Sequence, residues 1–100
     1  KIRETIRGWR IHLITWTSLG KIAEKVNPVL RGWYQYYGRF YKSEMYPVLR
    51  NVERYLVLWA RRKYKKLARH GQKARKYLGG VCKREPGLFV HWEMGLGSAD

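Results

Sequence analysis

The acidic residues are the first place to look for chemistry, because most hydrolytic and phosphoryl-transfer sites depend on carboxylates. Two-metal phosphoryl chemistry needs clustered carboxylates, and glycoside hydrolysis needs a facing pair. The seven acids of this sequence are spread singly along 100 residues: Glu4, Glu24, Glu44, Glu53, Glu85, Glu93 and Asp100. This scatter argues against a polymerase or nuclease site within the chain, and we expect no catalytic residue.

Histidine and cysteine provide no better candidate for a metal centre. The chain has three histidines and one cysteine, namely His12, His70, His91 and Cys82. Their spacing fits none of the common zinc-binding patterns, and a single cysteine cannot form a disulfide within the chain. No glycine-rich phosphate loop is present either. We therefore expect neither a metal ion nor a cofactor, and we interpret Cys82 as a small core residue.

Basic residues carry the clearest functional signal. There are 22 lysines and arginines against seven acids, a formal net charge of +15. A field of this size attracts polyanions, of which nucleic acid is the commonest. The densest run starts at Arg61, and no acid lies one helical turn away within it to relieve the repulsion. We predict phosphate contacts from nine of its residues: Arg61, Arg62, Lys63, Lys65, Lys66, Arg69, Lys73, Arg75 and Lys76.

Aromatic residues add a second mode of contact. Trp33 and Tyr37 fall on the apolar stripe predicted for their helix, so we favour core packing for both. Tyr34 and Tyr36 lie off that stripe, and Tyr64 lies inside the basic run. Exposed aromatic rings stack on splayed nucleic-acid bases. These last three tyrosines are therefore the predicted base-stacking residues.

The elements that must position these side chains are predicted to be helices. Apolar residues recur at helical spacing through most of the chain. We expect an all-α fold, a small bundle of about three to five helices with a short extended C-terminal segment. One domain should span residues 1–95, followed by a disordered tail at 96–100. No apolar stretch is long enough to span a bilayer.

Capping residues give the predicted boundaries of the first helices. One helix should cover residues 1–16, and a short second helix should end before Asn27-Pro28. Asparagine is a good N-cap and proline suits the first helical position, so a third helix should begin there and end near Tyr41. Gly32 indicates the close approach of a neighbouring element. A fourth helix should begin at Ser43.

The fourth helix should change character along its length. Its apolar residues form one narrow face: Val48, Val52, Tyr55 and Trp59. After Ala60 that face becomes basic, so the helix should leave the core or kink, and Gly71 should end or kink its continuation. A short or bent helix should follow at 74–82. The apolar segment Leu88–Trp92 should be extended and fold back on the bundle.

Three motifs in this order resemble a known family. Asn27–Trp33, followed by Tyr36–Phe40, resembles the core motif of the maturase-specific domain of group II introns, the X or thumb domain of intron-encoded reverse transcriptase/maturases. The segment Trp59–Tyr64 is similar to that family's tryptophan-then-basic helix, and Leu88–Trp92 to its closing Phe-x-His-Trp segment. One departure is Gln35, with Tyr36, where many members carry an asparagine just before the tyrosine pair. The residues that carry the motifs are Asn27, Pro28, Gly32, Trp33, Tyr37, Trp59, Phe89 and Trp92.

The resemblance implies a helical bundle that follows the fingers and palm of an RNA-directed DNA polymerase. In that family the domain helps the parent protein to bind its intron RNA and so promotes splicing. It also acts as a thumb that grips the template–primer duplex, while the catalytic aspartates belong to the palm. The implied partners are group II intron RNA, template–primer and the polymerase palm and fingers, without a membrane. The implied location is the bacterial cytoplasm, or an organelle, as an intron ribonucleoprotein.

Other classes of function compete with this interpretation. A protein-interaction module would dock its tyrosine-rich helix on the polymerase palm and have only nonspecific affinity for nucleic acid. Salt separates the two, because phosphate contacts weaken steeply with salt and apolar docking does not. A helix-turn-helix protein fits the charge, but no compact two-helix unit with base-reading side chains is evident. A membrane-surface helix over 48–69 is less favoured, since its apolar and basic parts are successive rather than opposite.

Overall fold

The computed structural model describes residues 2–37, 42–69 and 71–93. These ranges contain α-helices and short 3₁₀ helices and no strand, which confirms the predicted all-α bundle. The elements in chain order are α1 (Ile2–Trp9), η1 (Ile11–Leu13), α2 (Leu19–Tyr37), α3 (Lys42–Lys63), η2 (Lys65–Leu67), α4 (Gly71–Arg84) and α5 (Val90–Glu93). The tail predicted at 96–100 lies outside the described residues. None of the helices in these ranges combines the length and the apolar composition that crossing a membrane requires.

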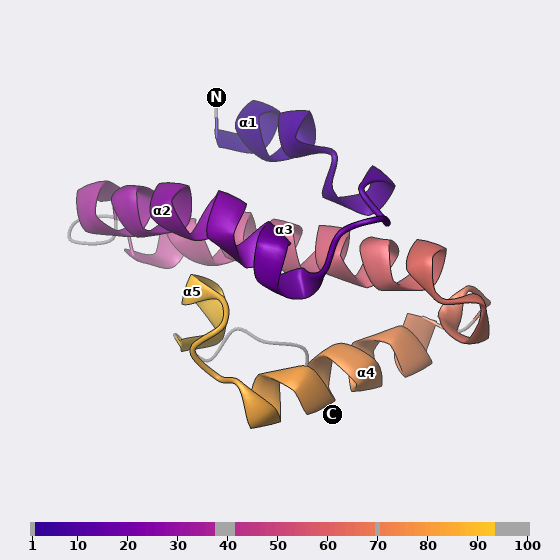
Figure 1. Ribbon diagram of the computed structural model, residues 1–100. Helices are drawn as coiled ribbons and strands as arrows, with labels where there is room; N and C mark the ends of the chain where they lie inside the picture. Colours follow the sequence, from indigo (N-terminus) through magenta and orange to yellow (C-terminus); the bar gives the residue numbers. More distant parts are fainter. Residues whose placement is uncertain (1, 38–41, 70, 94–100) are drawn as a thin grey trace.

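Helix α3 is the central element of the bundle (Figure 1). Helix α2 runs antiparallel beside it, with α1 on one side of this pair and α4 and α5 on the other. Helix α3 contacts α1, η1, α2, η2 and α4. Helix α3 therefore carries the first residues of the basic run, and its contacts with η2 and α4 position the others.

The buried surface of α3 is broader than the predicted narrow face. Val48 and Tyr55, which the pattern placed on that face, are only half-buried. Four fully buried residues, three or four apart, form the actual stripe: Leu49, Val52, Leu56 and Trp59. Each such burial stabilises the fold by roughly 1.5–3 kcal/mol. The helix ends at Lys63, whereas the sequence predicted that it would leave the core or kink after Ala60 and continue to Gly71.

Helix α2 continues through Asn27-Pro28, so the helix boundary predicted there is wrong. Its buried residues form one stripe on both sides of the proline: Leu19, Ile22, Ala23, Val26 and Leu30. Proline in a helix interior costs about 3 kcal/mol because it removes one hydrogen bond and crowds the preceding turn. Pro28 is exposed, and burial of the continuous stripe against the bundle outweighs this local cost.

The N-terminal segment is also shorter than predicted. Helix α1 ends at Trp9, and Arg10 adopts a left-handed conformation with φ 50° and ψ 45° before η1 begins. An arginine in this region is uncommon, and it breaks the helix expected over residues 1–16. The turn lets Ile6 and Ile11 both be fully buried, although they belong to different elements.

The C-terminal segment is helical where an extended conformation was predicted. Val90–Glu93 form the single turn of α5. Asn27 holds its start: the Asn27 Nδ2 group donates to the carbonyl oxygen of Leu88 at 2.7 Å, and the Val90 N–H donates to Asn27 Oδ1 at 3.1 Å. Asn27 thus does cap a helix, but the helix lies some sixty residues away along the chain.

The basic run is divided between two helices. The continuation predicted up to Gly71 is broken at Tyr64, and Gly71 begins α4 instead of ending a helix. Helix α4 then continues through Gly79-Gly80 without a break. Gly79 is buried together with Ala74 and Leu78. A buried glycine in a helix is tolerated where packing compensates its low helical propensity.

Candidate nucleic-acid interface

The turn between α3 and α4 is held by a member of the basic run. Arg61 donates from Nε and Nη2 to the carbonyl oxygen of Ala68, at 3.1 and 2.9 Å. Both bonds come from one guanidinium group, whose rigid fork suits such a clamp. This donor set is committed within the chain, so Arg61 shapes the surface on which its neighbours lie.

Lys63 is committed in a similar way. Its Nζ donates to the carbonyl oxygen of Thr17 at 2.7 Å and lies 4.9 Å from the centre of the Trp59 ring. The Trp59 Nε1 group donates to the carbonyl oxygen of Ile14 at 3.1 Å. Together these bonds attach the segment before α2 to the end of α3. Two of the nine predicted phosphate-binding residues therefore have side chains that stabilise the fold.

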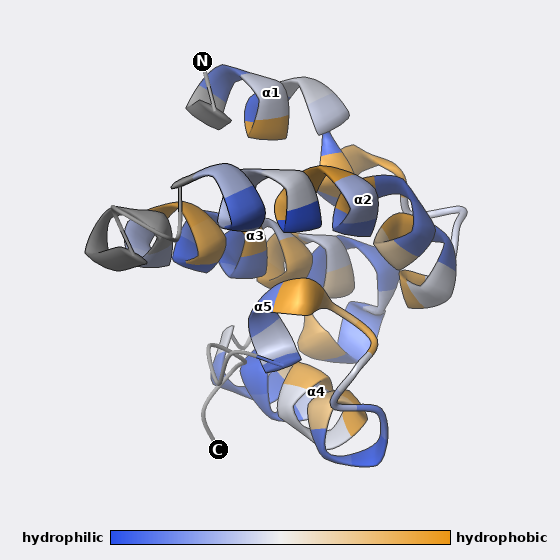
Figure 2. Ribbon diagram, turned by 90° about the vertical axis from the view of Figure 1, so that its left-hand side faces the viewer, coloured by the Kyte–Doolittle hydropathy of each residue, from blue (hydrophilic) through white to orange (hydrophobic). Residues whose placement is uncertain are grey.

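The other seven predicted phosphate-binding residues are exposed, and we call them the cationic surface: Arg62, Lys65, Lys66, Arg69, Lys73, Arg75 and Lys76. Figure 2 shows how hydrophilic and hydrophobic residues alternate along α4, whose buried side contains Ala74 and Leu78. Arg69, Lys73 and Lys76 line a shallow cavity of about 400 Å³ at the start of α4. The fold thus brings cations from η2 and α4 together at one end of the bundle.

The predicted stacking tyrosines lie in different places. Tyr64 is partly exposed and its ring packs at 89° on Trp59, with the ring centres 6.3 Å apart. Tyr36 is 73% exposed, and Tyr34 is half-buried, both on α2. Only Tyr64 adjoins the cationic surface in the sequence.

Tyr77 is a neighbour of Tyr64 that the sequence did not single out. The two rings are 5.3 Å apart, and the Tyr77 hydroxyl donates to the Tyr64 hydroxyl at 3.4 Å. Burial, and then the hydrogen bond to Tyr64, raise the pKa of Tyr77 to about 12. The raised pKa keeps the Tyr77 hydroxyl protonated into the alkaline range, where it can still donate to Tyr64.

Trp16 is a second aromatic residue that the sequence did not indicate. It is 81% exposed and lies between Ile14 and Thr17, whose carbonyl oxygens are bound by Trp59 and Lys63. This places an exposed indole at the same end of α3 as Tyr64. The sequence did not indicate the exposure of Trp16, because helical spacing placed this residue at the end of one helix over residues 1–16. The structure breaks that helix at Arg10.

Most of the residues that carry the family motifs are buried or half-buried in the bundle. Trp59, Phe89 and Trp92 are buried, and Trp33 is half-buried with its ring stacked on Trp9 at 5.8 Å. The side chain of Tyr37 lies outside the described residues. Gly32 is exposed, and a Cβ there would meet no described atom within 4 Å, so no described element makes the close approach expected of it.

A buried carboxylate joins α3 to α5. Glu53 is 8% exposed, and its Oε1 accepts hydrogen bonds from the Trp92 indole and lies 2.8 Å from His91 Nε2. We call Asn27, Glu53, His91 and Trp92 the α5 clasp, because their polar groups hold this helix in place. The position of Glu53 in the sequence gave no indication that its side chain faces the core. No group of three or more histidine, cysteine or acidic residues in the described ranges is arranged to hold a metal ion.

Comparison with known proteins gives one finding. A family model described as the group II intron, maturase-specific domain matches residues 1–78. The match covers α1 to most of α4 and leaves α5 outside it. No curated protein and no solved structure matches the chain. The family match confirms the resemblance drawn from the sequence motifs.

Proposed function

Because the chain belongs to the family of group II intron maturase-specific domains, we propose that it binds intron RNA through the cationic surface. The family's role lies in the splicing of group II introns, and the domain is not itself catalytic. The observation that carries the proposal is the exposure of seven cations between Arg62 and Lys76, a stretch without a single acid. Unrelieved positive charge of this density favours a polyanion as partner.

The mode of binding follows from the chemistry of these side chains. Lysine and arginine contacts to phosphate position an RNA but carry little sequence information. Recognition then depends on the shape of the folded RNA and on bases stacked on exposed rings. Trp16, Tyr36 and Tyr64 supply such rings, and we propose Trp16 and Tyr64 as the pair that works beside the cationic surface.

The same surface suits a polymerase thumb. We propose that the parent protein is an RNA-directed DNA polymerase, whose palm and fingers precede this domain and whose template–primer duplex the cationic surface grips. In this proposal the protein works as an intron ribonucleoprotein in the bacterial cytoplasm or in an organelle. Phosphate contacts that do not depend on base sequence suit both the binding of intron RNA and the gripping of template–primer, because both nucleic acids have a charged backbone.

The test is a charge reversal on the cationic surface. The variant Lys65→Glu/Lys66→Glu/Arg69→Glu should lose binding to the group II intron RNA while its helical circular-dichroism spectrum stays that of the parent, because all three side chains are exposed. The control is Lys21→Glu/Lys25→Glu/Arg31→Glu, an equal change of charge at exposed positions of α2. Binding that survives the first variant, or that both variants lose equally, would contradict the proposal.

The docking alternative keeps one observation in its favour. Trp16 and Tyr36 are the most exposed large hydrophobic side chains in the described residues, and such side chains also occur at protein interfaces. RNA affinity that falls steeply between 50 and 200 mM salt, by roughly 10³-fold or more if six phosphates are contacted, would favour the RNA interface. Salt-independent binding to the palm of a maturase, without RNA binding, would favour docking.

A further inference from the structure

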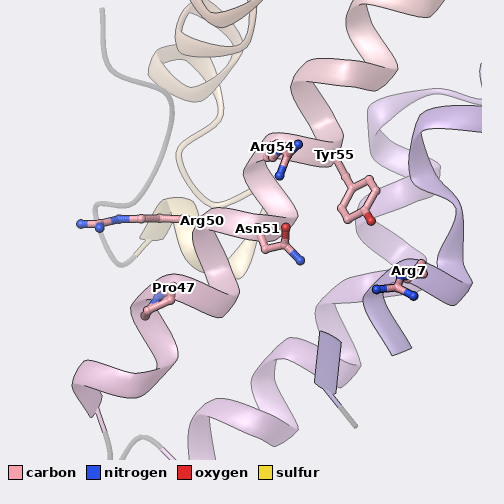
Figure 3. A pocket seen from close by; sticks show the side chains of 6 residues that line it. All are labelled: Arg7, Pro47, Arg50, Asn51, Arg54 and Tyr55. Carbon is pink, nitrogen blue, oxygen red and sulfur yellow. The ribbon is translucent and has the colours of Figure 1, made fainter. Parts of the chain in front are cut away.

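A second group of arginines lies away from the cationic surface, on the flank where α1 meets α3 (Figure 3). There a cavity of about 490 Å³ opens between the two helices. We call it the arginine groove, and its lining residues are Arg7, Pro47, Arg50, Asn51, Arg54 and Tyr55. In Figure 3, Asn51 points into the space between the helices, with Arg7 and Tyr55 beyond it, while Arg50 extends outward from α3.

The chemistry of the groove is that of an anion site. Three of its lining side chains are guanidinium groups, and none of the described lining side chains is acidic. Arg7, Arg50 and Arg54 are exposed, and within the described part of the chain their side chains make no hydrogen bond or ion pair. Arg61, by contrast, donates two hydrogen bonds to a carbonyl oxygen of the chain. The groove therefore offers charged donors that the described part of the fold does not use.

The fold holds these arginines on rigid elements. Ile6 and Leu49 are fully buried, so Arg7 and Arg50, which follow them directly, project from anchored helices. Arg50 and Arg54 are one turn apart on α3, where like charges repel each other. Tyr55 is fixed by its ring contact with His12, with centres 5.4 Å apart. An anion that contacts these arginines relieves the repulsion.

The groove also continues toward the cationic surface. Arg50, Arg54, Leu58 and Arg62 follow one another at four-residue intervals on α3, and Leu58 and Arg62 line an adjoining cavity of about 480 Å³ with His12. A helix rises 1.5 Å per residue, so these four positions extend over about 18 Å. One strand of a duplex carries a phosphate every 3.4 Å along its axis, or about five phosphates over that length.

We propose that the arginine groove is a second binding site for the phosphate backbone of a nucleic acid, one that works with the cationic surface. The planar guanidinium groups of Arg7, Arg50 and Arg54 bind phosphate oxygens in pairs. The amide of Asn51 and the hydroxyl of Tyr55 supply neutral partners for phosphate or ribose oxygens. This proposal rests on the proposed function, because it extends the same RNA interface along α3.

An acidic peptide would also be attracted to arginines, but the observations favour nucleic acid. Arg50, Arg54 and Arg62 lie along one inclined row of α3, about 18 Å long and interrupted only by Leu58, which suits a charged backbone that winds past the helix. The row also leads into the cationic surface through Arg62. A single polyanion that follows α3 contacts both surfaces at once.

The test removes charge from the groove and keeps polar, hydrogen-bonding side chains there. The variant Arg7→Gln/Arg50→Gln/Arg54→Gln is compared with the parent 100-residue chain in binding to the group II intron RNA and to a plain RNA duplex, with circular dichroism as the check of folding. Each lost phosphate contact lowers the salt dependence by about 0.7–0.9 log units per log unit of salt. If the three arginines each contact one phosphate, raising salt from 50 to 200 mM should weaken RNA binding by the parent about 20- to 40-fold more than RNA binding by the variant.

The controls separate the groove from the proposed function. The matched control Lys21→Gln/Lys25→Gln/Arg31→Gln loses the same charge from exposed positions of α2 and should bind like the parent. If the groove variant binds with the parent's affinity and salt dependence while reversal of Lys65, Lys66 and Arg69 abolishes binding, the groove proposal is overturned and the proposed function stands. Equal loss in the control, or binding of poly-glutamate in place of RNA, would also overturn it. A parent chain that binds no RNA would overturn the proposed function itself.

Discussion

In the middle of α3 the carboxylate of Glu53 is buried and accepts the indole N–H of Trp92, whereas just beyond the end of the same helix Lys65 and Lys66 are exposed. The first region is a set of buried polar groups that bond to one another, in which His91 Nδ1 is left without a partner among the described residues. The second is a set of charges that the described part of the chain leaves unrelieved. Buried polar groups without partners are costly, so the first region stabilises the fold, and the second is available to a partner.

Arg61 and Lys63 show that position in the sequence does not decide whether a charged side chain is bonded within the fold or available to a partner. Both belong to the basic run, yet both donate to carbonyl oxygens of the chain. Arg7 and Arg54 lie outside that run and are exposed. The available donors, and not the density of charge in the sequence, mark the expected interface.

The largest effect should come from the side chain that connects the two regions. Trp59 is 1% exposed, donates to Ile14 and packs under Lys63. Trp59→Ala should lower the free energy of unfolding by roughly 3–5 kcal/mol, because it leaves a cavity and an unpaired carbonyl group. Urea unfolding followed by circular dichroism measures the change. Trp16→Ala, at an indole that is 81% exposed, is the control and should cost less than about 0.5 kcal/mol.

The next effect should come from the α5 clasp. Glu53→Ala leaves the donors of His91 and Trp92 without their acceptor, which should cost roughly 2–4 kcal/mol. Glu53→Gln keeps one acceptor oxygen and should cost less. RNA affinity of the folded fraction should not change for either variant. An Ala variant as stable as the parent would show that the carboxylate is not what holds α5.

The sequence predicted the fold class and the approximate extent of α3 because both depend on local periodicity. It failed where a distant contact overrides local preference. Asn27-Pro28 is typical of a helix start, but the asparagine caps α5 and the helix continues through the proline. Likewise the left-handed turn at Arg10 follows from the burial of residues on both sides of it, which no local pattern reveals.

The candidate interface was predictable in location more than in detail. A run of cations without acids indicates a polyanion partner from composition alone. Which cations are engaged within the fold depends on contacts such as that between Lys63 and Thr17, 46 residues apart. The arginine groove combines Arg7 with residues of α3, and only the packing of α1 on α3 brings them together.

A smaller effect should separate two neighbouring lysines. Lys63→Met removes a 2.7 Å bond to Thr17 and should lower the free energy of unfolding by about 1–2 kcal/mol, with RNA affinity little changed. Lys65→Met should do the opposite, leaving stability within about 0.5 kcal/mol of the parent while weakening RNA binding. Urea unfolding and RNA titration of both variants measure the contrast. If Lys63→Met weakens RNA binding as much as Lys65→Met does, Lys63 contacts RNA, and its bond to Thr17 does not exclude it from the interface.

The smallest effect concerns the tyrosine pair beside the cationic surface. Burial and the bond to Tyr64 raise the pKa of Tyr77 to about 12, from an ordinary value near 10. The folded state therefore favours the neutral phenol. This contribution to stability is fully present below about pH 10 and is lost as the pH rises toward 12.

Replacement of either hydroxyl tests this contribution. Tyr77→Phe should make the free energy of unfolding fall less steeply between pH 10 and pH 12. At neutral pH the variant should differ little from the parent, because the bond between the hydroxyl groups is long at 3.4 Å. Tyr64→Phe should lower the pKa of Tyr77 only in part, since burial is the larger cause. Ultraviolet difference absorbance of the phenolate reads the pKa, and unfolding curves in the same buffers read the stability. If the parent and Tyr77→Phe lose stability in parallel over this range, the contribution lies elsewhere.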